Sequence, residues 1–159
     1  MTGLRTAANP RMKEIWDIGH STLPFFIFAE LLQKNRIEGL ADIRRFPTSK
    51  KSHHFARPEL AKNLAALGIT YYWFGPSLGG YRKGGFESWM KSQEFKQGMV
   101  ELKKLAQEKR IAVMCAEKYF GRCHRRYILD LLIKQGWTVH HLIPKRGRDE
   151  FKNQFRPTP

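Results

Sequence analysis

The feature that most constrains the fold is a regular alternation of short apolar segments with longer amphipathic ones. Five short segments, 14–18, 39–43, 69–74, 111–114 and 137–142, are rich in apolar, β-branched or aromatic residues and indicate strands. Four longer segments between them, 23–35, 58–67, 95–109 and 123–134, carry apolar side chains at helical spacing. Because parallel strands need long crossovers, this order predicts an α/β fold in which helices cover both faces of a parallel sheet.

We therefore predict a single-domain, three-layer, Rossmann-like α/β fold with an open sheet of about five mainly parallel strands. Segment 111–114 (Ile-Ala-Val-Met) has no polar residue, which is typical of a strand buried on both faces. The aromatic third strand and the polar fifth strand are expected at the edges, which favours the strand order 3-2-1-4-5. Residues 13–143 form the predicted domain, after a flexible leader (1–12) and before a basic tail (144–159).

Local signals predict where the helices begin and end. Thr22 or Ser21 is a suitable N-cap for the first helix, with Pro24 in its first turn. Gly68 and Gly136 are expected to end the second and fourth helices. Segment 75–85 contains five glycines and one proline, which predicts an irregular loop that is long enough to cover a site.

Polar clusters follow three of the predicted strands. They are Gly19-His20-Ser21-Thr22, Asp42-Ile43-Arg44-Arg45, and Cys115-Ala116-Glu117 with the later Cys123-His124-Arg125. In an open α/β sheet, the loops at the carboxyl ends of the strands meet in one crevice, and ligands bind there. The clusters therefore predict one shared site.

Charge indicates the class of partner. The formal net charge is +15, from 29 Lys and Arg against 14 Asp and Glu, and such an excess attracts anions such as nucleotides, phosphate or nucleic acid. A plain solvating role for these side chains is the alternative. The longest apolar stretch, 23–32, is interrupted by Pro24 and Glu30, and no signal peptide is evident, so we expect a cytoplasmic protein without a membrane span.

Four residues in these clusters are suited to catalysis. A thiol at the start of a helix, next to His124 and Arg125, has its thiolate favoured, so Cys123 is a candidate nucleophile, as is Cys115. His20 and Glu117 are candidates for proton exchange. The alternatives are a packed core cysteine at 115, a hydrogen-bonded loop histidine at 20 and an Arg-paired structural carboxylate at 117.

Anion binding is predicted for the basic side chains. Arg44, Arg125 and the helix start near Cys123 are suited to holding a phosphate or carboxylate. An Asp42–Arg44 ion pair that fixes the loop is equally expected. His20, Cys115, Glu117, Cys123 and His124 are chemically suitable metal ligands, but their spacing matches no standard pattern, so we assign no metal; the sequence leaves any cofactor open.

Three familiar motifs do not fit. Cys-Ala-Glu opens the zinc site of cytidine deaminases, but their later Pro-Cys-x-x-Cys is missing. Phosphatases and rhodanese-like transferases have a shorter loop between Cys and Arg than the one from Cys115 to Arg122. The paired glycines match neither the dinucleotide fingerprint nor the P-loop.

The same motifs carry a family resemblance. Ile18-Gly19-His20-Ser21-Thr22, Asp42-Ile43-Arg44 with Pro47 and Ser49, Leu78-Gly79-Gly80, and Met114-Cys115-Ala116-Glu117 through Cys123-His124-Arg125 resemble the domain of unknown function 488 family, over about 15–142. The resemblance implies a compact α/β domain and a site made of His20, Ser21, Asp42, Arg44, Gly79, Gly80, Cys115, Glu117, Cys123, His124 and Arg125. Family members often carry Arg where this chain has Leu23, so a contact made by that arginine would be missing.

Together these observations favour a small enzyme that acts on a phosphorylated, nucleotide or nucleic-acid-derived substrate. A non-catalytic nucleic-acid-binding module and a metal- or redox-dependent thiol protein are the alternatives. The sequence leaves open the substrate, the reaction, the protonation of Glu117 and the oligomeric state.

Overall fold

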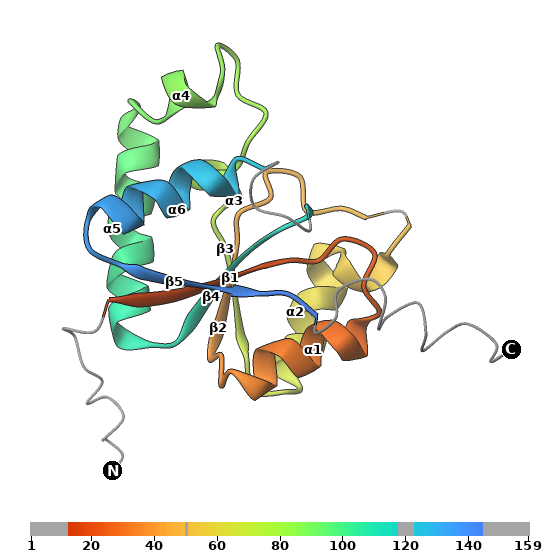
Figure 1. Ribbon diagram of the computed structural model, residues 1–159. Coiled ribbons are helices and arrows are strands. Elements are labelled where there is room, and N and C mark those ends of the chain that lie inside the picture. Colours follow the sequence, from red (N-terminus) through yellow and green to blue (C-terminus); the bar gives the residue numbers. More distant parts are fainter. Residues whose placement is uncertain (1–12, 50, 118–122, 145–159) are drawn as a thin grey trace, which may run out of the picture.

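A computed structural model describes residues 13–49, 51–117 and 123–144. The predicted leader and all but the first residue of the predicted tail lie outside these ranges. The described strands form one parallel sheet in the order β3-β2-β4-β1-β5 (Figure 1). They are β1 (Glu14–Gly19), β2 (Gly39–Asp42), β3 (Thr70–Trp73), β4 (Ile111–Cys115) and β5 (Thr138–Leu142).

Helices cover both faces of the sheet, which confirms the three-layer, Rossmann-like architecture (Figure 1). On one face lie α1 (Phe25–Lys34), the short 3-10 helix η2 (His53–Phe55) and α2 (Arg57–Ala65). On the other lie α5 (Gln93–Glu108) and α6 (Arg125–Lys134). Successive strand side chains point to opposite faces, so in β4 Val113 packs beneath α5 and α6 and Met114 beneath α1 and α2.

The predicted strand order is wrong at one point, because β1 and β4 are exchanged. Strand β4 lies at the centre, paired with β2 on one side and β1 on the other. Both strands are apolar enough for a buried position. Only β1 carries a charged residue, Asp17, in its buried stretch, and His141 of β5 lies directly opposite Asp17. The predicted edge positions of β3 and β5, and the pairing of β1 with β4, are confirmed.

Two local expectations are also corrected. Neither Ser21 nor Thr22 caps α1: residues 21 and 22 form a turn, and Pro24 occupies the N-cap position without a side-chain hydrogen bond. Segment 75–85, predicted to be irregular throughout, begins with the one-turn helix α3 (Gly75–Leu78). Leu78 is fully buried in the core beside α5, and this burial stabilises a turn that glycine content alone argues against.

The remaining boundaries lie close to prediction. Gly68 (φ +78°) and Gly136 (φ +90°) follow α2 and α6 in the left-handed conformation that glycine adopts without strain. A further one-turn helix, α4 (Phe86–Trp89), was not predicted. None of the helices in the described ranges has the length and apolar character needed to cross a bilayer.

Candidate functional site

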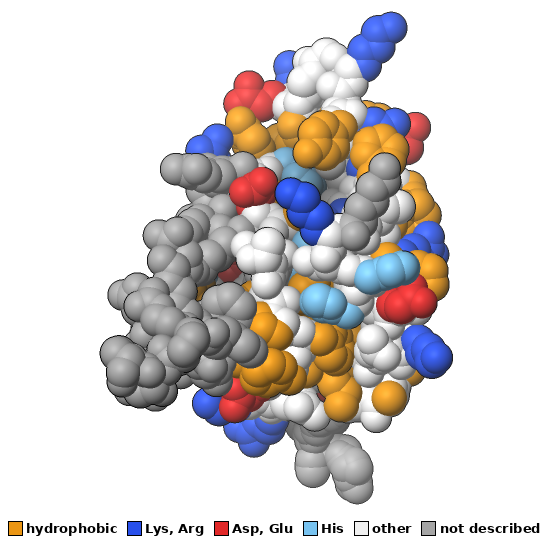
Figure 2. All heavy atoms as spheres, turned by 90° about the vertical axis from the view of Figure 1, so that its right-hand side faces the viewer, with side chains coloured by type: hydrophobic (Ala, Val, Ile, Leu, Met, Phe, Trp, Pro, Cys, Tyr) orange, Lys and Arg blue, Asp and Glu red, His pale blue; other side chains and the backbone are white. Residues whose placement is uncertain are grey.

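The loops after β1, β2 and β4 are joined by backbone hydrogen bonds, so the predicted clusters do meet at the carboxyl edge of the sheet. The amide of His20 donates to the carbonyl of Cys115 (3.0 Å), and that of Ser21 donates to Ala116 (2.8 Å). Chain direction changes here, since β1 leads to α1 on one face and β4 to α6 on the other. Such a switch point is where open α/β sheets bind ligands. Figure 2 shows this face, on which histidine and basic side chains lie among hydrophobic ones.

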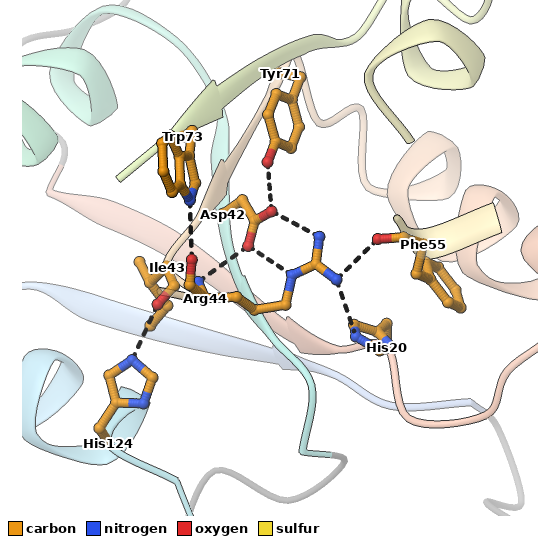
Figure 3. A network of polar contacts seen from close by, with 8 residues as sticks. All are labelled: His20, Asp42, Ile43, Arg44, Phe55, Tyr71, Trp73 and His124. Carbon is orange, nitrogen blue, oxygen red and sulfur yellow. Dashed lines mark hydrogen bonds and ion pairs between the residues drawn. The ribbon is translucent and has the colours of Figure 1, made fainter. Parts of the chain in front are cut away.

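Asp42 and Arg44 form a buried, bidentate ion pair (Figure 3). Arg44 donates from Nε (2.8 Å) and Nη2 (2.7 Å) to the two carboxylate oxygens, and from Nη1 to the carbonyl of Phe55 (2.8 Å). The Tyr71 hydroxyl adds a 2.5 Å hydrogen bond to Asp42, and burial raises the pKa of Tyr71, so it remains a donor. Since these partners occupy much of the guanidinium, the geometry favours the loop-fixing role of Arg44 over anion binding.

His20 is buried between this ion pair and an aromatic ring. Its ring stacks on Phe55 at 4.4 Å between centroids. Because the Ser21 carbonyl can only accept, Nδ1 (2.9 Å away) carries the proton, and Nε2 accepts from Nη1 of Arg44 at 3.4 Å. Burial, and secondly the charge of Arg44, lower the pKa of His20 to about 4. The imidazole is therefore neutral near pH 7.

The two thiols lie in contact. Sγ of Cys115, at the end of β4, is 2.7 Å from Sγ of Cys123, just before α6. The hydrogen bond from Cys115 lowers the pKa of Cys123 below its ordinary range, and His124 and the Arg125 amide (3.3 Å) act in the same direction against burial. The same hydrogen bond, with burial, raises the pKa of Cys115. These contacts favour the thiolate at Cys123 and the protonated, buried thiol at Cys115.

His124 links the thiols to the other loops. Its Nε2 donates to the carbonyl of Ile43 (3.1 Å), and its Nδ1 lies 3.6 Å from Sγ of Cys123 (Figure 3 shows the former contact). A methyl group on Gly80 would lie 3.1 Å from that ring, and one on Gly79 only 2.5 Å from a backbone oxygen. Both glycines therefore allow a close approach that side chains would prevent.

Arg125 is placed differently from the prediction of an anion-binding side chain. It is 1% exposed, and its Nε lies 3.1 Å from Oδ2 of Asp17, whose Oδ1 is 2.6 Å from Nδ1 of His141. Burial raises the pKa of Asp17 despite the opposing effect of Arg125 and His141. The side chain supports the start of α6 from within the core, and the Arg125 amide contacts Sγ of Cys123.

The remaining predicted residues lie at the rim. Glu117 is exposed two residues beyond β4, and its carbonyl is 3.8 Å from Sγ of Cys115. Ser21 has a left-handed backbone (φ +44°) and supplies the carbonyl that orients His20. Arg122 lies outside the described residues.

Sequence reasoning missed several supporting residues. These are Asp17, Phe55, Tyr71, Trp73 and His141, each in contact with a predicted site residue or its partner. A charged residue inside an otherwise apolar strand was the available signal for Asp17, because a buried carboxylate needs partners. The others are ordinary aromatic or edge-strand residues, and nothing in the sequence distinguishes them.

Two other features do not belong to this site. A hollow of about 360 Å³ at the opposite, amino-terminal edge of the sheet is lined by Lys13, Val100, Lys103, Lys104, Gln107, Gln135 and Trp137. Across the described ranges, no group of three or more His, Cys, Asp or Glu side chains is arranged to hold a metal ion. The metal alternative thus has no support from the geometry of these residues.

Comparison with known protein families gives one match. Residues 26–132, more than half of the chain, match the family described as "Domain of unknown function DUF488". Comparison with curated proteins and with solved structures found no match. The matched range contains both thiols and the Asp42–Arg44 pair, and the chain therefore belongs to the DUF488 family.

Proposed function

We propose that this protein is an enzyme that uses the Cys123 thiolate as a nucleophile on a phosphorylated, nucleotide or nucleic-acid-derived substrate. One observation carries the proposal: Sγ of Cys123 lies at the start of α6, within reach of the Cys115 thiol, the Arg125 amide and the His124 ring. Activated thiols in catalysis have such partners, because the thiolate and not the thiol attacks. The net charge of +15 supports an anionic substrate.

The chemistry follows from these contacts. Sγ of Cys123 forms a bond to an electrophilic carbon or phosphorus of the substrate, and the leaving group departs with the electron pair of the broken bond. Before the attack, Nδ1 of His124, which faces the sulfur, takes the proton of the Cys123 thiol, and it then gives this proton to the leaving group. Water then cleaves the covalent intermediate and returns the thiolate and the proton. Glu117, exposed at the rim, is the candidate for activating that water.

His20 acts as a positioning residue in this proposal. Both of its ring nitrogens have partners, and its pKa of about 4 makes it a poor proton donor at neutral pH. It holds Arg44 and the loop after β1, and through the His20–Cys115 backbone bond it supports the thiol pair.

A substrate panel tests the proposal. Nucleoside mono-, di- and triphosphates, para-nitrophenyl phosphate, and short DNA and RNA strands are incubated with the native protein, with Cys123→Ser and with Cys115→Ser. Turnover or a covalent adduct on Cys123 is expected with the native protein and should be absent from Cys123→Ser. Cys115→Ser should keep reduced activity. Full turnover by Cys123→Ser would overturn the nucleophile assignment.

A second candidate is reversible oxidation of the thiol pair, favoured by the 2.7 Å contact between the two sulfurs. The Cys123 thiolate would attack the O–O bond of a hydroperoxide, giving a sulfenic acid and an alcohol. Cys115 would then displace hydroxide from that sulfur, so that a disulfide forms and water leaves. Hydroperoxide should convert both thiols to one disulfide, and Cys115→Ser should accumulate the sulfenic acid. Two unreacted thiols after treatment would exclude this candidate.

A further inference from the structure

Two aromatic side chains lie exposed beside the thiol site. Phe46, in the loop after β2, is 59% exposed, and Tyr81, after α3, is 84% exposed. Their ring centroids are 6.1 Å apart, with an angle of 37° between the planes. The guanidinium of Arg45 lies over the Phe46 ring at 5.2 Å and donates a hydrogen bond to the Tyr81 carbonyl. We call Arg45, Phe46 and Tyr81 the aromatic platform.

The loop that carries Tyr81 is firmly held. Arg82 donates from its guanidinium to the carbonyls of Gly75, Pro76 and Gly79, and stacks on Trp89 at 3.9 Å. The exposure of Tyr81 is therefore imposed by a fixed loop, so its ring is available without any rearrangement.

The platform also connects directly to the proposed catalytic group. Gly79 packs against the backbone of Arg45, and Gly80 against the ring of His124, which faces Cys123. Tyr81 directly follows Gly80, the glycine in contact with His124. A ligand that stacks on Tyr81 is thus bound at the neighbouring residue.

The backbone of Tyr81 is unusual for such a residue. Its φ of +58° lies in the left-handed region, which disfavours bulky side chains. An exposed aromatic ring contributes little to folding, so packing does not explain why this position carries Tyr instead of Gly or Asn. Residues held in such conformations concentrate at ligand-binding sites.

We propose that the aromatic platform binds unpaired bases of a single-stranded nucleic acid. Stacking of bases on exposed aromatic rings, with arginine beside them, is how proteins hold single strands, and the bases of a duplex are not available for it. Arg45, the exposed Lys83 and the +15 net charge favour a polyanion over a neutral apolar partner, and the exposed rings favour bases over carboxylates. The proposal rests on the proposed function in one respect, since it names the bound strand as the substrate class.

Binding of a labelled oligothymidine strand, measured by fluorescence anisotropy at several salt concentrations, tests the proposal. The double variant Phe46→Ala/Tyr81→Asn removes both rings, and Asn tolerates the left-handed backbone. It should bind about tenfold more weakly, or worse, because stacking contributes about 1–3 kcal/mol per base. The salt dependence of its binding should be unchanged, because no phosphate contact is lost. Tyr81→Trp should bind as well as the native protein.

Phe26→Ala is the matched control, since Phe26 is an aromatic residue of α1 with 56% exposure. It should bind like the native protein. Equal binding by the double variant and the native protein would overturn the proposal, as would a duplex of the same length binding as tightly as the single strand. Complete displacement of the strand by an equal charge of polyglutamate would instead indicate an acidic protein partner.

The same measurement with Cys123→Ser separates this proposal from the proposed function. Strand binding should be retained in Cys123→Ser, because the platform does not include the thiol. If strand binding depends on the aromatic rings but Cys123→Ser has normal turnover, the aromatic platform is supported and the nucleophile assignment is overturned. Turnover that needs Cys123, together with equal strand binding by the double variant and the native protein, would support the nucleophile and overturn the aromatic platform.

Discussion

The Nε2 atom of His124 donates a hydrogen bond to the carbonyl oxygen of Ile43, at 3.1 Å. This contact joins the start of α6 to the loop after β2, and it orients Nδ1 toward Sγ of Cys123. The protonation of the thiol therefore depends on groups from two strand ends that lie far apart in the sequence.

The hydrogen bond between the thiols should control the acidity of Cys123. In Cys115→Ala the stabilising donor is lost, so the pKa of Cys123 should rise toward that of an ordinary thiol. Thiolate absorbance in the ultraviolet, followed against pH with Cys123→Ser as the baseline, measures this shift. Iodoacetamide should alkylate the native protein faster than Cys115→Ala at pH 6. Identical titration curves would show that Cys115 does not activate its neighbour.

The paired glycines should tolerate substitution differently. Gly79→Ala places a methyl group 2.5 Å from the carbonyl oxygen of Gly75, and backbone cannot move away easily, so a loss of stability of about 1–3 kcal/mol is expected. In Gly80→Ala the nearest atoms to the new methyl group belong to the His124 ring, which can shift, so the fold should survive while the pKa of Cys123 changes. Urea unfolding and the thiolate titration separate the two effects. Equal stability of both variants would contradict the assigned contacts.

His20 should make folding stability depend on pH. Its pKa is about 4 in the folded protein and 6.5 when unperturbed, so between these values the unfolded chain binds more protons. The stability from neutral His20 is fully present above about pH 6.5 and is lost as pH falls toward 4, by up to about 3 kcal/mol.

His20→Gln should flatten this dependence, whereas the contribution of Asp17, present in both proteins, cancels in the comparison. Urea unfolding of the native protein and His20→Gln from pH 4 to 7 provides the measurement. Parallel curves over that range would contradict a buried, neutral His20.

The Asp42–Arg44 pair should be costly to break. Asp42→Asn removes the charge that compensates a guanidinium only 6% exposed, and loss of one partner of such a pair costs about 3–5 kcal/mol. Arg44→Lys should also destabilise, because an ammonium cannot replace the bidentate contact. Glu30→Gln, in an exposed pair with Lys34, is the control and should change stability by less than about 0.5 kcal/mol. A similar midpoint of unfolding for Asp42→Asn and the control would show that the pair is not structural.

Much of the fold was predictable from local pattern. Ile111–Cys115 is entirely apolar, and such a strand is stable only in the middle of a sheet. The exchange of β1 and β4 was not predictable, because both strands are buried and the partners of Asp17 come from β5 and α6. The helix at Gly75–Leu78 was not predicted for a similar reason, since burial of Leu78 outweighs the low helix propensity of this glycine-rich segment.

The sequence by itself determined the kinds of side chain at the carboxyl edge of the sheet, because strand ends are marked by a change from apolar to polar residues. Only the tertiary structure decided which partner and which charge each of these side chains has. Arg44 and Arg125 are turned to buried carboxylates, His20 is kept neutral, and Cys123 receives the hydrogen bonds that favour its thiolate. The charge of each group is set by hydrogen bonding and burial, and both depend on neighbours that are distant in the chain.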